Sequence, residues 1–64
     1  MPMTPKEMVR YLENHGFKKI NGGDGSHQKM YNPATNRTTE VPMSKPELDK
    51  DLEYAILRQA GLRK

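Results

Sequence analysis

The residues best suited to chemistry lie in one short stretch, where glycines precede a serine and a histidine. Gly22, Gly23 and Gly25 are followed directly by Ser26 and His27. Glycine tolerates positive φ angles and lets the backbone approach another backbone or a ligand closely. An imidazole can accept or donate a proton near neutral pH. We predict that any reaction the protein catalyses takes place at this stretch.

The residues that follow are expected to form a strand with His27 near its start. Side chains alternate between the two faces of a strand, so His27, Lys29 and Tyr31 share one face and Met30 points to the core. A histidine beside a lysine and a tyrosine can bind a phosphate, stack on a base and move a proton. A solvated strand face with an incidental histidine explains the same spacing, and both interpretations stay open here.

The rest of the sequence offers little else for catalysis or metal binding. His15 falls in the last turn of a predicted helix, where an imidazolium interacts well with the negative end of the helix dipole, and we interpret it as structural. The absence of cysteine excludes disulfides, thiolate chemistry and the common structural zinc sites. We therefore predict no metal and no cofactor.

Size and charge limit the possible functions. The 64 residues are expected to form one domain, 1–64, near the lower size limit for a fold held by its core alone, so any site is a shallow surface or groove. The net charge of +3 attracts polyanions such as nucleic acid, although an ordinary soluble surface also explains it.

No apolar run approaches the roughly 20 residues of a membrane span and no signal peptide opens the chain, which predicts a cytoplasmic protein.

Two helices are predicted from start and stop signals. A capping box at residues 4–7 begins a helix over 4–15 that ends at Gly16, and a similar box at 44–47 begins a helix over 45–60. Apolar residues recur at helical spacing in both segments. Those expected to face the core are Met8, Val9, Tyr11 and Leu12 in the first helix and Leu48, Leu52, Ala55 and Ile56 in the second.

Three strands are predicted between the helices, over residues 17–21, 26–31 and 37–41. Turn-forming residues at 32–36 close a hairpin between the last two, and Pro42 ends the third because it cannot donate to a ladder. The order α-β-β-β-α predicts an α+β fold. Both helices are expected on one face of a three-stranded antiparallel sheet, with the other face open.

Several motifs in this order are similar to those of the HicA family, small toxins of bacterial and archaeal toxin–antitoxin pairs. They are Gly25-Ser26-His27, the following Met30-Tyr31, the strand ending Val41-Pro42, and the run Ile-Leu-Arg-Gln-Ala-Gly-Leu at 56–62. The resemblance covers essentially the whole chain. It implies a fold like a double-stranded-RNA-binding domain and the activity of an mRNA-cleaving endoribonuclease. It also implies that His27 is catalytic and that a HicB-type antitoxin covers the site.

A mechanism compatible with these residues needs no metal, because RNA supplies its own 2′-hydroxyl nucleophile. His27 is expected to act as the general base, or alternatively as the acid for the leaving 5′-oxygen. RNA contacts are expected from Ser26 and the backbone around Gly25, with Lys29 neutralising charge and Tyr31 stacking on a base. One histidine cannot fill both roles in one step, so water or Lys29 must fill the other.

Two other functions fit parts of the sequence. A non-catalytic RNA-binding module of the double-stranded-RNA-binding type explains the fold, the charge and Lys29, but it gives no reason for His27 beside the glycines. An inactivated relative that acts only through protein–protein association is the third possibility.

Overall fold

The five predicted elements are present in the predicted order. The computed structural model describes residues 3–23 and 25–63, so Asp24, inside the glycine stretch, lies outside the described residues. The elements are α1 (Pro5–Asn14), β1 (Lys18–Ile20), β2 (His27–Asn32), β3 (Arg37–Pro42) and α2 (Lys50–Gln59). Neither described helix has the length and apolar character needed to cross a bilayer.

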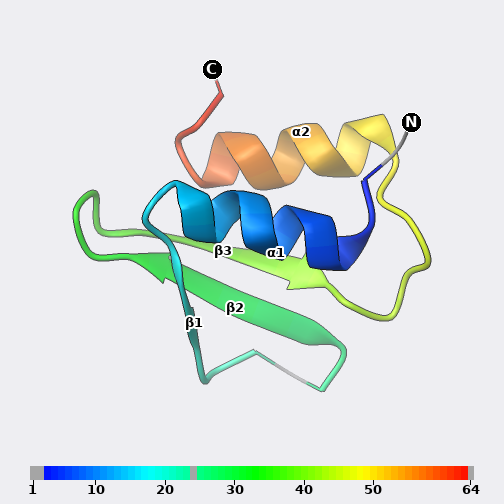
Figure 1. The fold of residues 1–64 in the computed structure, drawn as a ribbon, viewed down its shortest axis with the longest axis horizontal. Helices are drawn as coiled ribbons and strands as arrows, with labels where there is room; N and C mark the ends of the chain where they lie inside the picture. The colour runs from blue at the N-terminus through cyan, green and yellow to red at the C-terminus, as the bar shows by residue number, and fades with distance from the viewer. Residues whose placement is uncertain (1–2, 24, 64) are drawn as a thin grey trace.

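The strands form one antiparallel sheet in the order β1-β2-β3, and both helices lie on the same side of it (Figure 1). Met30 on β2 is opposite Thr39 on β3, and both are buried together with Val41 beneath the helices. The prediction of Met30 as a core residue is therefore correct. The α+β fold, like that of a double-stranded-RNA-binding domain, is confirmed.

The first helix begins and ends as predicted. The Thr4 hydroxyl accepts a hydrogen bond from the Glu7 amide at 3.2 Å, and the Glu7 carboxylate accepts one from the Thr4 amide at 2.8 Å. At the other end Gly16 has a φ of +94°, and the Phe17 amide donates to the Leu12 carbonyl at 3.0 Å. This is a Schellman stop. Tyr11, which was expected to face the core, is exposed instead.

The second helix starts later than predicted. The capping box expected at 44–47 does not form, and α2 begins at Lys50 with Asp49 as its N-cap. The Asp49 carboxylate accepts a hydrogen bond from the Leu52 amide at 2.8 Å. Aspartate is among the strongest N-cap residues, so Asp49 caps the helix effectively and the residues at 44–47 are not needed as a cap.

Leu48 explains why the helix cannot start earlier. Its amide donates to the Met3 carbonyl at 2.7 Å in an isolated antiparallel bridge, and its side chain is fully buried. Extended backbone at this position is incompatible with a helix that begins at 45. Ala55 is also exposed rather than in the core, whereas Ile56 and Ala60 are buried.

Because the capping box at 4–7 forms and the one at 44–47 does not, two similar substitutions are expected to have unequal effects. Thr4→Ala removes a formed N-cap and is expected to cost about 0.5–2 kcal/mol of folding free energy. Ser44→Ala removes a serine that caps no helix and is exposed, so the melting temperature is expected to stay at the wild-type value. In a domain of this size each kcal/mol lowers the melting temperature by roughly 4–8 °C. Thermal unfolding followed by circular dichroism measures both, and equal losses would contradict the observed start of α2.

The end of α2 is tied to the sheet by residues of the Arg-Gln-Ala-Gly-Leu run. The Thr39 hydroxyl donates to the side-chain oxygen of Gln59 at 2.9 Å, which satisfies a buried polar group. Gly61 has a φ of +76°, and a Cβ atom there would lie 2.6 Å from Cδ and Nε of Arg37. The Leu62 amide closes the helix on the Leu57 carbonyl at 2.9 Å. This run therefore has a structural role.

Candidate active site

His27 is the first residue of β2 and lies on the face of the sheet opposite the helices. Its neighbour in sequence on the same strand face is Lys29, whereas Met30 points into the core. Across the strand pair, His27 is opposite Pro42 at the end of β3. The imidazole is partly buried, so it is held in place and still accessible from the open face.

Ser26 holds the His27 ring. Its hydroxyl oxygen lies 3.2 Å from Nδ1 of His27, and its carbonyl accepts a hydrogen bond from the Met43 amide at 2.7 Å. The serine is thus fixed to the end of β3 through its backbone. A hydroxyl can either donate to Nδ1 or accept from it, so this contact suits the imidazole whichever ring nitrogen carries the proton. The contact with Ser26 engages Nδ1 and therefore fixes how the imidazole is oriented at the start of β2.

The glycine turn packs against the start of β2. A Cβ atom on Gly23 would lie 2.6 Å from the carbonyl oxygen of His27 and 3.3 Å from the Lys29 amide nitrogen, so only glycine fits without a backbone shift. Gly22 has a φ of +126°, and a Cβ atom there would lie 3.4 Å from Cδ and 3.8 Å from Nζ of Lys29. Gly25 faces open space. The turn therefore positions His27 and Lys29 together.

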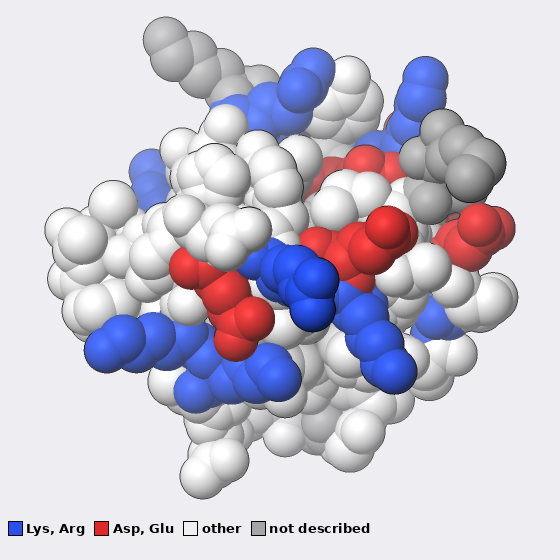
Figure 2. All heavy atoms as spheres, viewed as in Figure 1, with Lys and Arg blue, Asp and Glu red and all other residues white. Residues whose placement is uncertain are grey.

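The open face of the sheet carries charged residues of both signs. The strand register places Lys18 opposite Tyr31 and Lys29 opposite Glu40, all on the face that His27 shares. Two lysines on this face are thus accompanied by one carboxylate. Acidic and basic side chains are also interspersed on the face seen in Figure 2. Lys18 and Lys29 are the cations of the open face that can contact a phosphate backbone.

Tyr31 shares this face with His27 but lies at the other end of β2. Four residues along a strand correspond to about 13 Å, and the Tyr31 hydroxyl donates to the Asn36 side chain at 2.9 Å in the hairpin. The two side chains are therefore aligned but not adjacent. A base that stacks on Tyr31 belongs to a different nucleotide from the one whose phosphate contacts His27.

Gln28 is a supporting residue that the sequence pattern did not indicate. Its side-chain amide donates to the Ile20 carbonyl at 3.3 Å and to the Lys29 carbonyl at 3.0 Å, which ties the end of β1 to β2. These hydrogen bonds form only when the two strands pair, so no local sequence motif predicts them. The requirement for glycine at position 23 was also not predictable from local sequence, because it arises from a close contact with β2.

The second histidine has the structural role predicted for it. His15 is the C-cap of α1, its Nδ1 lies 2.8 Å from the Tyr11 carbonyl oxygen, and the two rings are 4.3 Å apart. Within residues 3–23 and 25–63, no group of three or more His, Cys, Asp or Glu side chains is placed to hold a metal ion.

Comparisons with known proteins agree with these motifs. The model of the HicA toxin family, described as a toxin of bacterial toxin–antitoxin pairs, matches residues 5–62. A chain in a solved toxin–antitoxin complex from Streptococcus pneumoniae is 46% identical, with a TM-score of 0.80 over 95% of this chain and 100% of that chain. Comparison with curated protein sequences gives no significant match. The chain belongs to the HicA family and is a toxin of a toxin–antitoxin system.

Proposed function

We propose that this toxin is an mRNA-cleaving endoribonuclease of the cytoplasm in which His27 is the catalytic acid or base. The observation that carries the proposal is the contact between the Ser26 hydroxyl and Nδ1 of His27 at 3.2 Å, beside a glycine turn on the open face of the sheet. A partly buried, oriented imidazole next to a lysine is a suitable arrangement for proton transfer at a phosphodiester. Membership of the HicA family supports the same activity.

The reaction is transesterification within the RNA. The 2′-hydroxyl loses its proton and its oxygen forms a bond to the adjacent phosphorus, while the bond from phosphorus to the 5′-oxygen breaks. The departing 5′-oxygen takes up a proton, which leaves a 2′,3′-cyclic phosphate and a 5′-hydroxyl. As base, Nε2 of His27 accepts the first proton; as acid, it supplies the second. Ser26 supports either state, because its hydroxyl can donate to or accept from Nδ1.

Charge builds up on the phosphate oxygens during this step, and the site has two sources of stabilisation. The Lys29 side chain lies over Gly22, with Nζ 3.8 Å from where a Cβ atom would be, so its ammonium is at the turn that also contacts His27. The backbone at Gly25, where a Cβ atom would meet nothing within 4 Å, leaves room for a phosphate to approach. Positioned donors and cations of this kind stabilise transition-state charge. The remaining proton transfer falls to Lys29 or water, since Tyr31 is too distant.

The partner proposed for this toxin is a HicB-type antitoxin that covers the open face of the sheet. The solved relative from Streptococcus pneumoniae is part of a toxin–antitoxin complex, which supports an antitoxin partner. Both helices lie on the other side of the sheet (Figure 1), so they leave the face with His27 accessible. An antitoxin bound there would keep RNA away from the imidazole.

The proposal predicts the products and the substrate of cleavage. A purified single-stranded RNA in excess EDTA is expected to be cut into fragments with 2′,3′-cyclic phosphate and 5′-hydroxyl ends, detected by mass spectrometry. A DNA of the same sequence is expected to stay intact because it lacks the nucleophile. Equal cutting of DNA, or fragments with 3′-hydroxyl ends, would contradict the mechanism. Binding of RNA without cleavage, unchanged in His27→Ala, would favour the RNA-binding module instead.

A further inference from the structure

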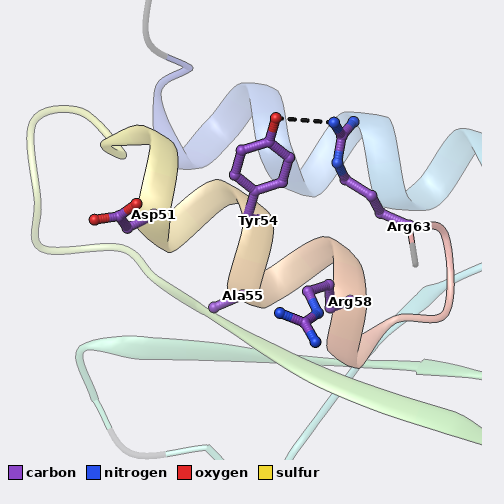
Figure 3. Close-up of a pocket in the computed structure, with 5 residues that line it drawn as sticks. All are labelled: Asp51, Tyr54, Ala55, Arg58 and Arg63. Atoms are coloured by element: carbon purple, nitrogen blue, oxygen red, sulfur yellow. Dashed lines mark hydrogen bonds between the residues drawn. The ribbon is translucent and has the colours of Figure 1, made fainter.

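The exposed face of α2 has features of an interaction surface that the proposed nuclease activity does not use. One side of α2 carries four residues at positions i, i+3, i+4 and i+7, the spacing that places side chains on the same face of a helix. They are Asp51, Tyr54, Ala55 and Arg58. Together with Arg63 from the C-terminal segment they line a hollow of about 460 Å³ (Figure 3). The Tyr54 side chain is 42% exposed, although it is one of the largest side chains in the protein.

The aromatic residue of this surface contacts an arginine from the C-terminal segment. The Arg63 guanidinium donates to the Tyr54 hydroxyl at 2.8 Å and lies 4.1 Å from the centre of the ring, and Figure 3 shows both side chains on the same side of α2. Tyrosine and arginine are among the residues most enriched at the energetic centres of protein interfaces. A side chain whose orientation is favoured by such contacts loses less conformational entropy when a partner binds.

The charges of this surface are self-complementary. Asp51 and Arg58 lie at equal distances in sequence from the midpoint between Tyr54 and Ala55. When two copies of α2 pack antiparallel about a two-fold axis at that midpoint, Asp51 of each copy is opposite Arg58 of the other. Tyr54 and Ala55 then meet at the centre, where alanine permits close approach of the helices. Within the described part of the chain, neither Asp51 nor Arg58 has an ion pair that would compete.

We propose that the exposed face of α2 is a homodimer surface, with Asp51 and Arg58 forming two symmetric ion pairs across it. Arg63 already occupies one face of the Tyr54 ring, so that face is not available for stacking on a base, and the opposite charges of Asp51 and Arg58 match those of a second copy of the same helix. One ten-residue helix per copy gives an interface well below the ~800 Å² per partner of stable complexes, so we expect a weak dimer that forms only toward millimolar concentration. Since α2 and the open sheet face are on opposite sides, both copies keep that face free.

The test is the oligomeric state of charge-swapped variants, measured by sedimentation equilibrium up to millimolar concentration. Each single variant, Asp51→Arg or Arg58→Asp, turns both ion pairs of the dimer into pairs of like charge. Each is therefore expected to raise the dissociation constant about tenfold or more. The two changes together restore opposite charges and are expected to restore association. Ala55→Arg places bulk and charge at the axis and is expected to abolish it. Arg10→Asp, the same change on an exposed residue of α1, is the matched control and leaves association unchanged.

Three results would overturn the proposal. A wild-type protein that stays monomeric at millimolar concentration has no such dimer. Association that both single charge variants leave unchanged uses another surface. Amide resonances of α2 that shift on addition of an RNA oligonucleotide or a hexaglutamate peptide, but not with protein concentration, would assign the surface to nucleic acid or to an acidic partner. Circular dichroism of every variant separates loss of association from loss of folding.

Discussion

Replacing His27 with alanine is expected to lower the rate of RNA cleavage about 10²–10⁴-fold, the usual contribution of a general acid or base. The imidazole is only partly buried, so its removal is expected to leave the fold intact. RNA binding is expected to change little, because Lys18 and Lys29 remain on the same face. The loss should therefore appear in kcat at saturating RNA, measured with a fluorescent single-stranded substrate in excess EDTA.

His15 provides the matched control for this experiment. It is the second of the two histidines in the chain, but its ring is held at the end of α1 by the Tyr11 carbonyl. His15→Ala is expected to cleave RNA at the wild-type rate. Equal rates for wild type and His27→Ala would show that His27 is not the catalyst. Equal losses in the two histidine variants would instead point to a general effect of removing a histidine, and the assignment of His27 would fail.

The two capping boxes show what local sequence can and cannot predict about this fold. The residues at 4–7 form the predicted box, with both of its hydrogen bonds present. The residues at 44–47 carry nearly the same signal, but Leu48 pairs with Met3 and is buried, and Asp49 caps the helix instead. That contact joins segments that are far apart in the sequence. A local signal cannot reveal such a competitor, which is why the start of α2 was the main error.

The sequence likewise predicted some features of the candidate site and missed others. Alternation along β2 correctly separates Met30 in the core from the face with His27 and Lys29, because the period of a strand is a local property. The resemblance to HicA drew attention to Gly25, Ser26 and His27. It could not show that the serine contacts Nδ1 of the histidine, since that depends on how the turn enters the strand.

The glycines before His27 are expected to differ sharply in their tolerance of alanine. A Cβ atom on Gly23 would lie 2.6 Å from the His27 carbonyl oxygen, so Gly23→Ala must move the backbone that carries the imidazole. Displacements approaching 1 Å in an active site cost on the order of 10² in rate, and we expect a fall in kcat of about that size. Overpacking of this kind also destabilises folded proteins by typically about 1–3 kcal/mol, which thermal unfolding would show.

Gly25→Ala is the comparison that makes this test specific, because no atom lies within 4 Å of the position where its Cβ would be built. Its melting temperature and kcat are expected to match the wild type. If the Gly25 backbone contacts RNA, as the HicA motif implies, the added methyl group raises KM without changing kcat. Gly23→Ala is expected to do the reverse, lowering kcat and stability together. Wild-type stability and kcat in Gly23→Ala would mean that the turn does not position His27, and the catalytic role of this geometry would have to be abandoned.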